Sequence, residues 1–245
     1  MNEKNCDMHC HILPGVDDGA KNMDISRRML ETAQREGIYS IIATPHYHPG
    51  KSKGKIDQWN LALEAVQEMA GQIDSRFKIF SGSEIWYQHG IEDLLLSRKL
   101  WTMCGTHYVL IEFSAGAGFS YMRDGLFNLQ RSGFYPILAH VERYSCLTDI
   151  GKVRELAEMG IYLQMNADTA LMGKQMFVGR QIRNLLKQRC IHFIGTDAHD
   201  VRHRSLRMRE CRAYVGKLCG YEYANEICSR NTRKVIAGEK ILLPY

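Results

Sequence analysis

The segment Asp7-Met8-His9-Cys10-His11 places two imidazoles two residues apart near the start of the chain. Residues i and i+2 of an extended strand share a face, so we expect His9 and His11 to point the same way. Neutral imidazole is the commonest metal ligand in proteins. This strand is therefore predicted to supply part of a metal site. Because a lone His-x-His pair is a weak signal, the prediction depends on what the other strands carry.

Short apolar runs alternate with amphipathic segments along all 245 residues. Seven of these runs are predicted to be strands, at residues 6–12, 40–44, 78–82, 108–113, 135–139, 161–165 and 192–195. Strands that alternate with helices pair in parallel, with the helices outside. The sequence thus predicts one α/β domain over residues 1–245, a distorted TIM-like barrel of the (β/α)7 type. An open, doubly wound sheet is the alternative.

A residue able to bind a metal follows or closes nearly every predicted strand. In such barrels the active-site groups lie at the C-terminal ends of the strands. The expected metal ligands are His9, His11, Asp18, His46, Glu84, Glu112, His140, Asp197 and His199. Asp18 belongs to the turn signal Asp17-Asp18-Gly19 and is included because it follows the His-x-His pair closely. Histidines scattered through a core would not fall at strand ends with this regularity.

This set of ligands is too large for one four-coordinate zinc ion. Nitrogen and oxygen ligands without thiolate suit manganese, iron or zinc. A cluster of two or three ions accounts for the number of ligands, with a carboxylate such as Glu84 as a bridge. Metal binding lowers the pKa of a bound water towards about 7, so that water would be the nucleophile in hydrolysis.

Composition excludes several other classes of protein. The net charge of +5 is too small to indicate a nucleic-acid partner by itself. No apolar run approaches the roughly 18 residues of a membrane span, and no signal-peptide core is present, so we expect a cytoplasmic protein without membrane insertion. The eight cysteines form no Cys-x-x-Cys pair and are expected to be free thiols. None has arginine six residues later, which excludes cysteine phosphatase chemistry of the Cys-x5-Arg type.

Six motifs together resemble the PHP (polymerase and histidinol phosphatase) superfamily. They are Asp7-x-His9-x-His11, Thr44-Pro45-His46, Gly82-Ser83-Glu84-Ile85, Leu110-Ile111-Glu112-Phe113, Ala139-His140-Val141-Glu142-Arg143-Tyr144 and Thr196-Asp197-Ala198-His199. Within this superfamily the chain resembles the bacterial manganese-dependent protein tyrosine phosphatases encoded with capsule and exopolysaccharide genes. The resemblance runs from about residue 5 to residue 234, and residues 13–19 and 140–144 are its most specific parts.

This resemblance implies a PHP-type barrel that binds Mn²⁺ at up to three positions. One ion would take His9, His11, Glu84 and Asp197; a second, Glu84, Glu112 and His140; a third, Asp18, His46 and His199. It also implies that Arg143 and Arg204 bind phosphate. The residues beside Arg204 are His203 and Ser205, whereas relatives often have Gly-Arg-Pro there, so Arg202 and Arg207 are alternatives.

The activity implied is hydrolysis of phosphotyrosine in a protein, with the tail of a bacterial tyrosine autokinase that controls polysaccharide export as the expected partner. Phenol, with a pKa near about 10, is a favourable leaving group. The alternatives are a histidinol phosphatase, a 3′–5′ exonuclease, an amidohydrolase and a metal-stabilised binding module. The small net charge argues against the exonuclease, and Glu112 stands where amidohydrolases commonly carry a modified lysine. Because all nine expected ligand positions are filled, a module that has lost catalysis is disfavoured.

Overall fold

The computed structural model describes residues 4–52, 54–176 and 179–243, and all strands in this part of the chain pair in parallel. The strands are β1 (Asn5–Cys10), β2 (Ile38–Ala43), β3 (His46–Tyr47), β4 (Lys78–Ser81), β5 (Glu84–Trp86), β6 (Tyr108–Glu112), β7 (Tyr135–Leu138), β8 (Tyr162–Asn166) and β9 (Phe193–Gly195). They form one sheet in the order β1-β2-β4 and a second in the order β3-β5-β6-β7-β8-β9. The predicted alternation of parallel strands and helices is confirmed, and the strands form a curled sheet.

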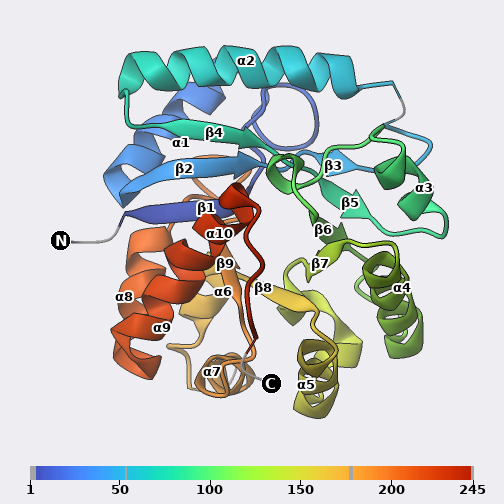
Figure 1. Cartoon of the computed structure of the whole chain (residues 1–245). Coiled ribbons are helices and arrows are strands. Elements are labelled where there is room, and N and C mark those ends of the chain that lie inside the picture. The colour runs from blue at the N-terminus through green and yellow to red at the C-terminus, as the bar shows by residue number, and fades with distance from the viewer. Residues whose placement is uncertain (1–3, 53, 177–178, 244–245) are drawn as a thin grey trace.

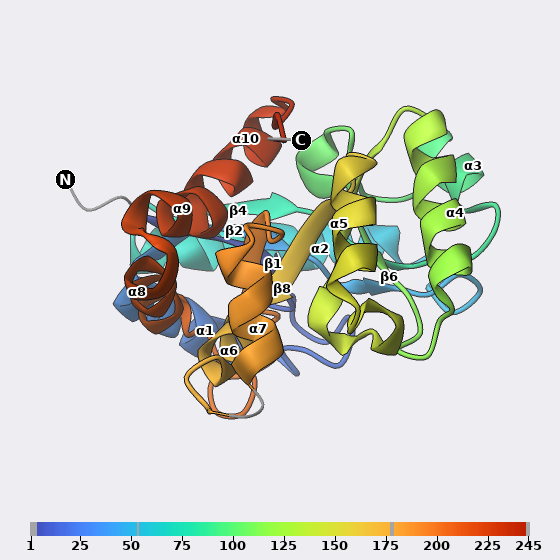
Figure 2. The ribbon, with the colours of Figure 1, turned by 90° about the horizontal axis from the view of Figure 1, so that it is seen from below.

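Helices cover the outside of the curled sheet (Figures 1 and 2). They are α1 (Met23–Glu36), α2 (Ile56–Ile73), α3 (Ile91–Leu96), α4 (Phe119–Arg131), α5 (Ile150–Glu158), α6 (Ala167–Met172), α7 (Gly179–Lys187), α8 (Met208–Cys219), α9 (Tyr221–Asn225) and α10 (Asn231–Ala237). Helix α1 begins where the Asn22 side chain accepts a hydrogen bond from the Ile25 amide, and it ends at Gly37, whose φ of 73° suits glycine. Within the described residues, no helix is both long and apolar enough to cross a bilayer.

Two of the predicted strands are longer than expected and are interrupted. After β2, residues Thr44 and Pro45 break the strand before it resumes as β3, and Gly82 and Ser83 separate β4 from β5 in the same way. Proline has no amide hydrogen for the sheet ladder, although the Pro45 carbonyl accepts from the Glu84 amide at 3.1 Å. The resumed strands place His46 directly opposite Glu84.

Strand β1 carries a bulge next to these interruptions. Asp7 pairs with Ile41 and Cys10 with Ala43, so β1 holds one residue more than β2 over this stretch. Bulges commonly re-aim side chains beside active sites. Beyond the bulge, β1 meets the segment after β9, where the Asp197 amide donates to the His9 carbonyl at 2.7 Å and the His11 amide to the Ala198 carbonyl at 2.9 Å.

The hydrophobic core has two layers. Tyr108 and Leu110 of β6 face an inner cluster enclosed by the strands, whereas Val109 and Ile111 pack in the outer layer beneath the helices. The segment after α10 covers the N-terminal ends of β6 and β8. The Tyr108 hydroxyl donates to the Glu239 carbonyl at 2.9 Å, and the Tyr162 hydroxyl donates to the Ile241 carbonyl at 2.7 Å. Each fully buried aliphatic side chain contributes about 1.5–3 kcal/mol. Packed side chains thus fill the interior between the strands, and the candidate site lies at the opposite, C-terminal rim.

All eight cysteines are free thiols, as predicted. Cys6, Cys10, Cys190, Cys211 and Cys228 are buried. A buried thiol acts as a small apolar side chain, so these residues serve packing.

His192 should make the fold sensitive to acid. Its Nδ1 accepts from the Leu163 amide at 2.9 Å, and burial lowers its pKa to about 3. Between pH 6.5 and 3 the unfolded chain therefore binds a proton that the folded chain does not, so stability falls as the pH falls. We expect acidification from pH 7.5 to 5.5 to cost the wild type about 1.4 kcal/mol more than His192→Asn, which keeps an acceptor near Nδ1. Urea unfolding at both pH values measures this difference, and equal losses in the two proteins would contradict it.

Candidate metal centre

The structure brings all nine residues predicted as metal ligands to the C-terminal rim of the strands. His9 is on β1, His46 begins β3, Glu84 begins β5 and Glu112 ends β6. The remaining predicted ligands lie on the connections that leave β1, β7 and β9: His11, Asp18, His140, Asp197 and His199. Parallel pairing explains the convergence, since it places the C-terminal ends of neighbouring strands side by side.

The deepest group consists of His9, His11, Glu84 and Asp197, all fully buried. One donor atom from each lies within 4.8 Å of every other. Glu84 Oε2 is 3.2 Å from His9 Nε2 and 3.3 Å from His11 Nε2. Asp197 Oδ1 is 3.5 Å and 3.3 Å from the same two nitrogens. These are the four residues that the superfamily resemblance assigns to one ion.

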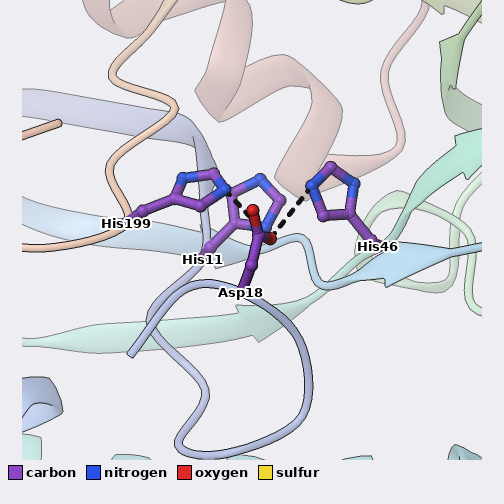
Figure 3. A group of neighbouring side chains, drawn as sticks. All are labelled: His11, Asp18, His46 and His199. Carbon is purple, nitrogen blue, oxygen red and sulfur yellow. Dashed lines mark ion pairs between the residues drawn. The ribbon is translucent and has the colours of Figure 1, made fainter. Parts of the chain in front are cut away.

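A second group lies nearer the surface and contains His11, Asp18, His46 and His199 (Figure 3). Asp18 comes from the loop after β1, and its carboxylate lies between the two outer imidazoles. Its Oδ1 is 3.3 Å from His46 Nε2 and 3.4 Å from His199 Nε2. The Asp18 side chain is 66% exposed, so this group opens to solvent.

The third group joins Glu84 and Glu112 to two imidazoles. His46 Nδ1 is 3.0 Å from Glu84 Oε2 and 3.8 Å from Glu112 Oε2. His140 Nε2 approaches the other oxygens of both carboxylates, at 2.7 Å from Glu84 Oε1 and 3.4 Å from Glu112 Oε1. Glu84 thus contributes to two groups, and so does His46, whose two nitrogens face different neighbours.

The arrangement of these oxygen and nitrogen atoms suits the binding of metal ions better than it suits hydrogen bonds among the side chains themselves. Among the described residues, Glu84 Oε2, Asp197 Oδ1, His46 Nδ1 and His199 Nε2 are buried and have no hydrogen-bond partner. Buried polar atoms are rarely left in this state. Several of them lie within 3.5 Å of opposing donor atoms without hydrogen-bond geometry, so they converge on shared points. Imidazole and carboxylate are suitable ligands for manganese, iron or zinc.

Two of these residues stand on unusual backbone. His140 has a φ of 31° and Asp197 a φ of 52°, in the left-handed region that side chains other than glycine seldom adopt. Such strain persists only where the surroundings hold it. Here the His140 amide donates to Gln164 Oε1 at 2.8 Å, and the Asp197 amide donates to the His9 carbonyl. The left-handed turns direct both side chains back over the rim.

The electrostatics of the site are those of carboxylates balanced by imidazoles. Burial opposes ionisation of Glu84, but His9, His11, His140 and His46 hold its pKa well below the usual value. Burial likewise opposes protonation of His140, yet Glu112 and Glu84 raise its pKa to about 9. A metal ion needs the neutral imidazole, so metal binding displaces such protons.

Arg143 and Arg204 meet on one oxygen of Asp197. Both guanidinium groups lie 2.6 Å from Asp197 Oδ2, on the side away from the imidazoles. Their side chains are 41% and 38% exposed, so each can also reach solvent. Arg207, one alternative to Arg204, pairs instead with Asp168 and Glu210. The loop places Arg204 near the centre because the amides of His199 and Asp200 both donate to the Arg204 carbonyl.

Sequence reasoning missed Asp17, which it treated only as part of a turn. The buried Asp17 carboxylate lies 2.8 Å from His11 Nδ1 and accepts from the His46 amide at 3.0 Å. Burial opposes its ionisation, but His11 and the amides of Gly19 and His46 lower its pKa. Asp7 was also missed; it accepts from the amide and the hydroxyl of Thr196. A carboxylate hydrogen-bonded to a ligand imidazole fixes its orientation.

Comparison with known proteins gives one consistent result. The family model for capsular polysaccharide synthesis, CpsB/CapC, matches residues 5–237. The tyrosine-protein phosphatase CpsB of Streptococcus pneumoniae is 30% identical over 241 residues, covering 96% of this chain and 99% of the relative. The tyrosine-protein phosphatase YwqE of Bacillus subtilis is 33% identical over 226 residues, covering 88% of this chain and 85% of the relative.

A solved structure agrees with these sequence relatives. A chain from the crystal structures of YwqE and CpsB, described as unique metal-dependent tyrosine phosphatases, matches with a TM-score of 0.89 at 28% sequence identity. The match covers 97% of this chain and 96% of the other. The similarity therefore includes the whole rim that carries the nine residues.

Mn²⁺ should stabilise the chelator-treated protein, because only the folded chain gathers these donor atoms. At one hundred times the dissociation constant, we expect a gain of about 2.7 kcal/mol in the free energy of unfolding. Asp18→Asn, at an exposed position, should reduce this response without unfolding the chain, whereas Asp168→Asn should leave it intact. Thermal unfolding with and without Mn²⁺ measures it. A midpoint that Mn²⁺ does not move would contradict the assignment of the metal centre.

Proposed function

The chain belongs to the CpsB/CapC family of capsular polysaccharide synthesis, and from this premise we propose that it is a metal-dependent protein tyrosine phosphatase. The observation that carries the proposal is the position of Arg143 and Arg204 against the metal centre. Asp197 presents Oδ1 to the buried imidazoles and Oδ2 to the two guanidinium groups. A phosphoryl group that approaches from solvent would meet the centre and both arginines together.

Two sets of residues would have different roles in the reaction: one would bind the metal ions and the other would bind the phosphate. His9, His11, Asp18, His46, Glu84, Glu112, His140, Asp197 and His199 would hold the metal ions. When bound, the ions would neutralise charge on the phosphoryl group and activate a water for attack. Arg143 and Arg204 would grip phosphate oxygens, since guanidinium binds them in a bidentate fork. The leaving phenol has a pKa near about 10 and needs little help from a general acid.

The finer features follow from the same premise. The proposed cofactor is Mn²⁺, two or three ions per site, with iron or zinc as the alternatives. The proposed substrate is a phosphotyrosine protein, the tail of a tyrosine autokinase that regulates capsular polysaccharide synthesis. The proposed architecture is a single domain over residues 1–245, a distorted (β/α)7 barrel of the PHP type. Hydrogen bonds between β1 and the segment after β9 support this closure of the sheet.

Phosphate release from two substrates tests the proposal. The chelator-treated protein, reconstituted with Mn²⁺, is given a phosphotyrosine peptide and, separately, histidinol phosphate. We expect Mn²⁺-dependent turnover of the peptide, abolished in His140→Ala and Asp197→Ala while their unfolding transitions remain cooperative. Preference for histidinol phosphate, or full activity in either variant, would contradict the proposal.

Arg143 and Arg204 should contribute more to turnover than the nearby Arg207 does. Removing one charge-assisted contact to phosphate costs about 1.5–3 kcal/mol, or roughly 10- to 150-fold in kcat/KM. We expect losses of this size in Arg143→Ala and Arg204→Ala. Arg207→Ala is the matched control, because its partners Asp168 and Glu210 lie outside the metal centre. Steady-state kinetics on the phosphotyrosine peptide measures all three, and a loss in Arg207→Ala equal to that in Arg204→Ala would remove Arg204 from its role.

A further inference from the structure

Two amide side chains of β8 lie beneath the metal centre and connect ligands from three other segments. Gln164 and Asn166 are buried, and the alternation along β8 turns both towards the interior. Gln164 contacts His9 and the backbone of His140, and Asn166 contacts Asp197. Neither belongs to the expected ligand set, and neither offers a good metal ligand in the presence of so many imidazoles and carboxylates.

The hydrogen bonds fix which way each amide points, starting from Asp197. A carboxylate only accepts, so the atom of Asn166 that lies 2.7 Å from Asp197 Oδ2 must be Nδ2. Asn166 Oδ1 then faces Gln164, whose Nε2 donates to it at 2.9 Å. The remaining atom, Gln164 Oε1, is therefore directed towards His9 and His140.

The hydrogen bonds at His140 and His9 require the same orientation of the Gln164 amide. The His140 backbone amide can only donate, and it lies 2.8 Å from Gln164 Oε1. His9 Nδ1 lies 3.2 Å from the same oxygen and must carry the proton, since Oε1 has none to give. Nε2 of His9, which faces Glu84 and Asp197, is then the ring nitrogen available to bind a metal ion.

We propose that Gln164 and Asn166 are positioning residues that hold His9 in its Nδ1–H form and tie it to Asp197 across the rim. The pair holds His9 Nε2 and Asp197 Oδ1 3.5 Å apart, where both would bind the same metal ion. His11 obtains the same form from the Asp17 carboxylate at its Nδ1. His9 differs because its partner is a neutral amide, whose orientation is set by the His140 amide at one end and by Asn166 at the other. The inference rests on the proposed metal centre and requires no particular substrate.

Metal affinity provides the first test. Mn²⁺ is titrated calorimetrically into the chelator-treated full-length chain, as wild type and as Gln164→Leu, which preserves volume and removes every hydrogen bond of the amide. We expect Mn²⁺ affinity to fall about 10- to 100-fold, the usual effect of removing a partner behind a metal ligand. Gln67→Leu is the matched control, because Gln67 donates to the Ile79 carbonyl, away from the centre. Equal affinity in wild type and Gln164→Leu would overturn the proposal.

A double-mutant cycle tests whether the two amides act as one unit. Asn166→Ala breaks the tie to Asp197 but leaves Gln164 Oε1 fixed by the His140 amide. The double variant should bind Mn²⁺ no more weakly than Gln164→Leu alone, because both changes break the same connection. Losses that add would mean that the two residues act independently and would contradict the proposal. If Gln164→Leu does not fold, Asn166→Ala alone must still lose Mn²⁺ affinity for the proposal to stand.

The His9 tautomer provides a further test. It would not change if Gln164 served only to pack the interior. The ¹⁵N chemical shifts of His9 in the chelator-treated chain distinguish the Nδ1–H from the Nε2–H form. We expect Nδ1–H in wild type and in Asn166→Ala, and a mixture of the two forms in Gln164→Leu. An Nε2–H form in wild type would refute the proposal. Neither readout measures phosphate release, so failure here is distinguishable from failure of the proposed phosphatase activity.

Discussion

The buried carboxylate of Glu84 is the constraint around which the rim is arranged. A carboxylate removed from water is costly unless opposing charge or hydrogen-bond donors surround it. Glu84 lies within 3.3 Å of imidazole nitrogens from His9, His11, His46 and His140. No lysine or arginine among the described residues forms an ion pair with it. Protons on the imidazoles, or metal ions in their place, must therefore supply the compensating charge.

The fold meets this constraint by fixing the backbone from which the ligands project. The interruption before β3 and β5 brings His46 opposite Glu84, and the β1 bulge lies beside His9. Asp17, Gln164 and Asn166 then orient the imidazoles and Asp197 from behind. The outer residues Asp18, Arg143 and Arg204 remain partly exposed. A rigid, buried half of the site would hold the ions, while an accessible half would meet the phosphoryl group.

The sequence predicted which residues meet at the rim better than it predicted which residues support them. Strand ends are visible as apolar runs followed by histidine or a carboxylate, and parallel pairing necessarily brings them together. The break at Thr44 and Pro45 and the bulge in β1 depend on the partner strand, which a local pattern does not contain. Gln164 is one polar residue in an apolar run, with no motif around it. Its importance becomes visible only when both neighbours of its amide are known. The path of the loop after His199 places Arg204, and not Arg207, beside the candidate metal centre. Sequence spacing alone does not reveal this path.

We propose that one rim of the curled sheet holds a cluster of metal ions between buried imidazoles and carboxylates. Anomalous X-ray diffraction at the manganese edge, from crystals of the full-length chain grown with Mn²⁺, tests it most directly. We expect strong peaks at the centre of the group formed by His9, His11, Glu84 and Asp197, with at least one more peak beside Glu112 or Asp18. Manganese bound elsewhere on the chain, with no peak among these side chains, would contradict a metal cluster at this rim.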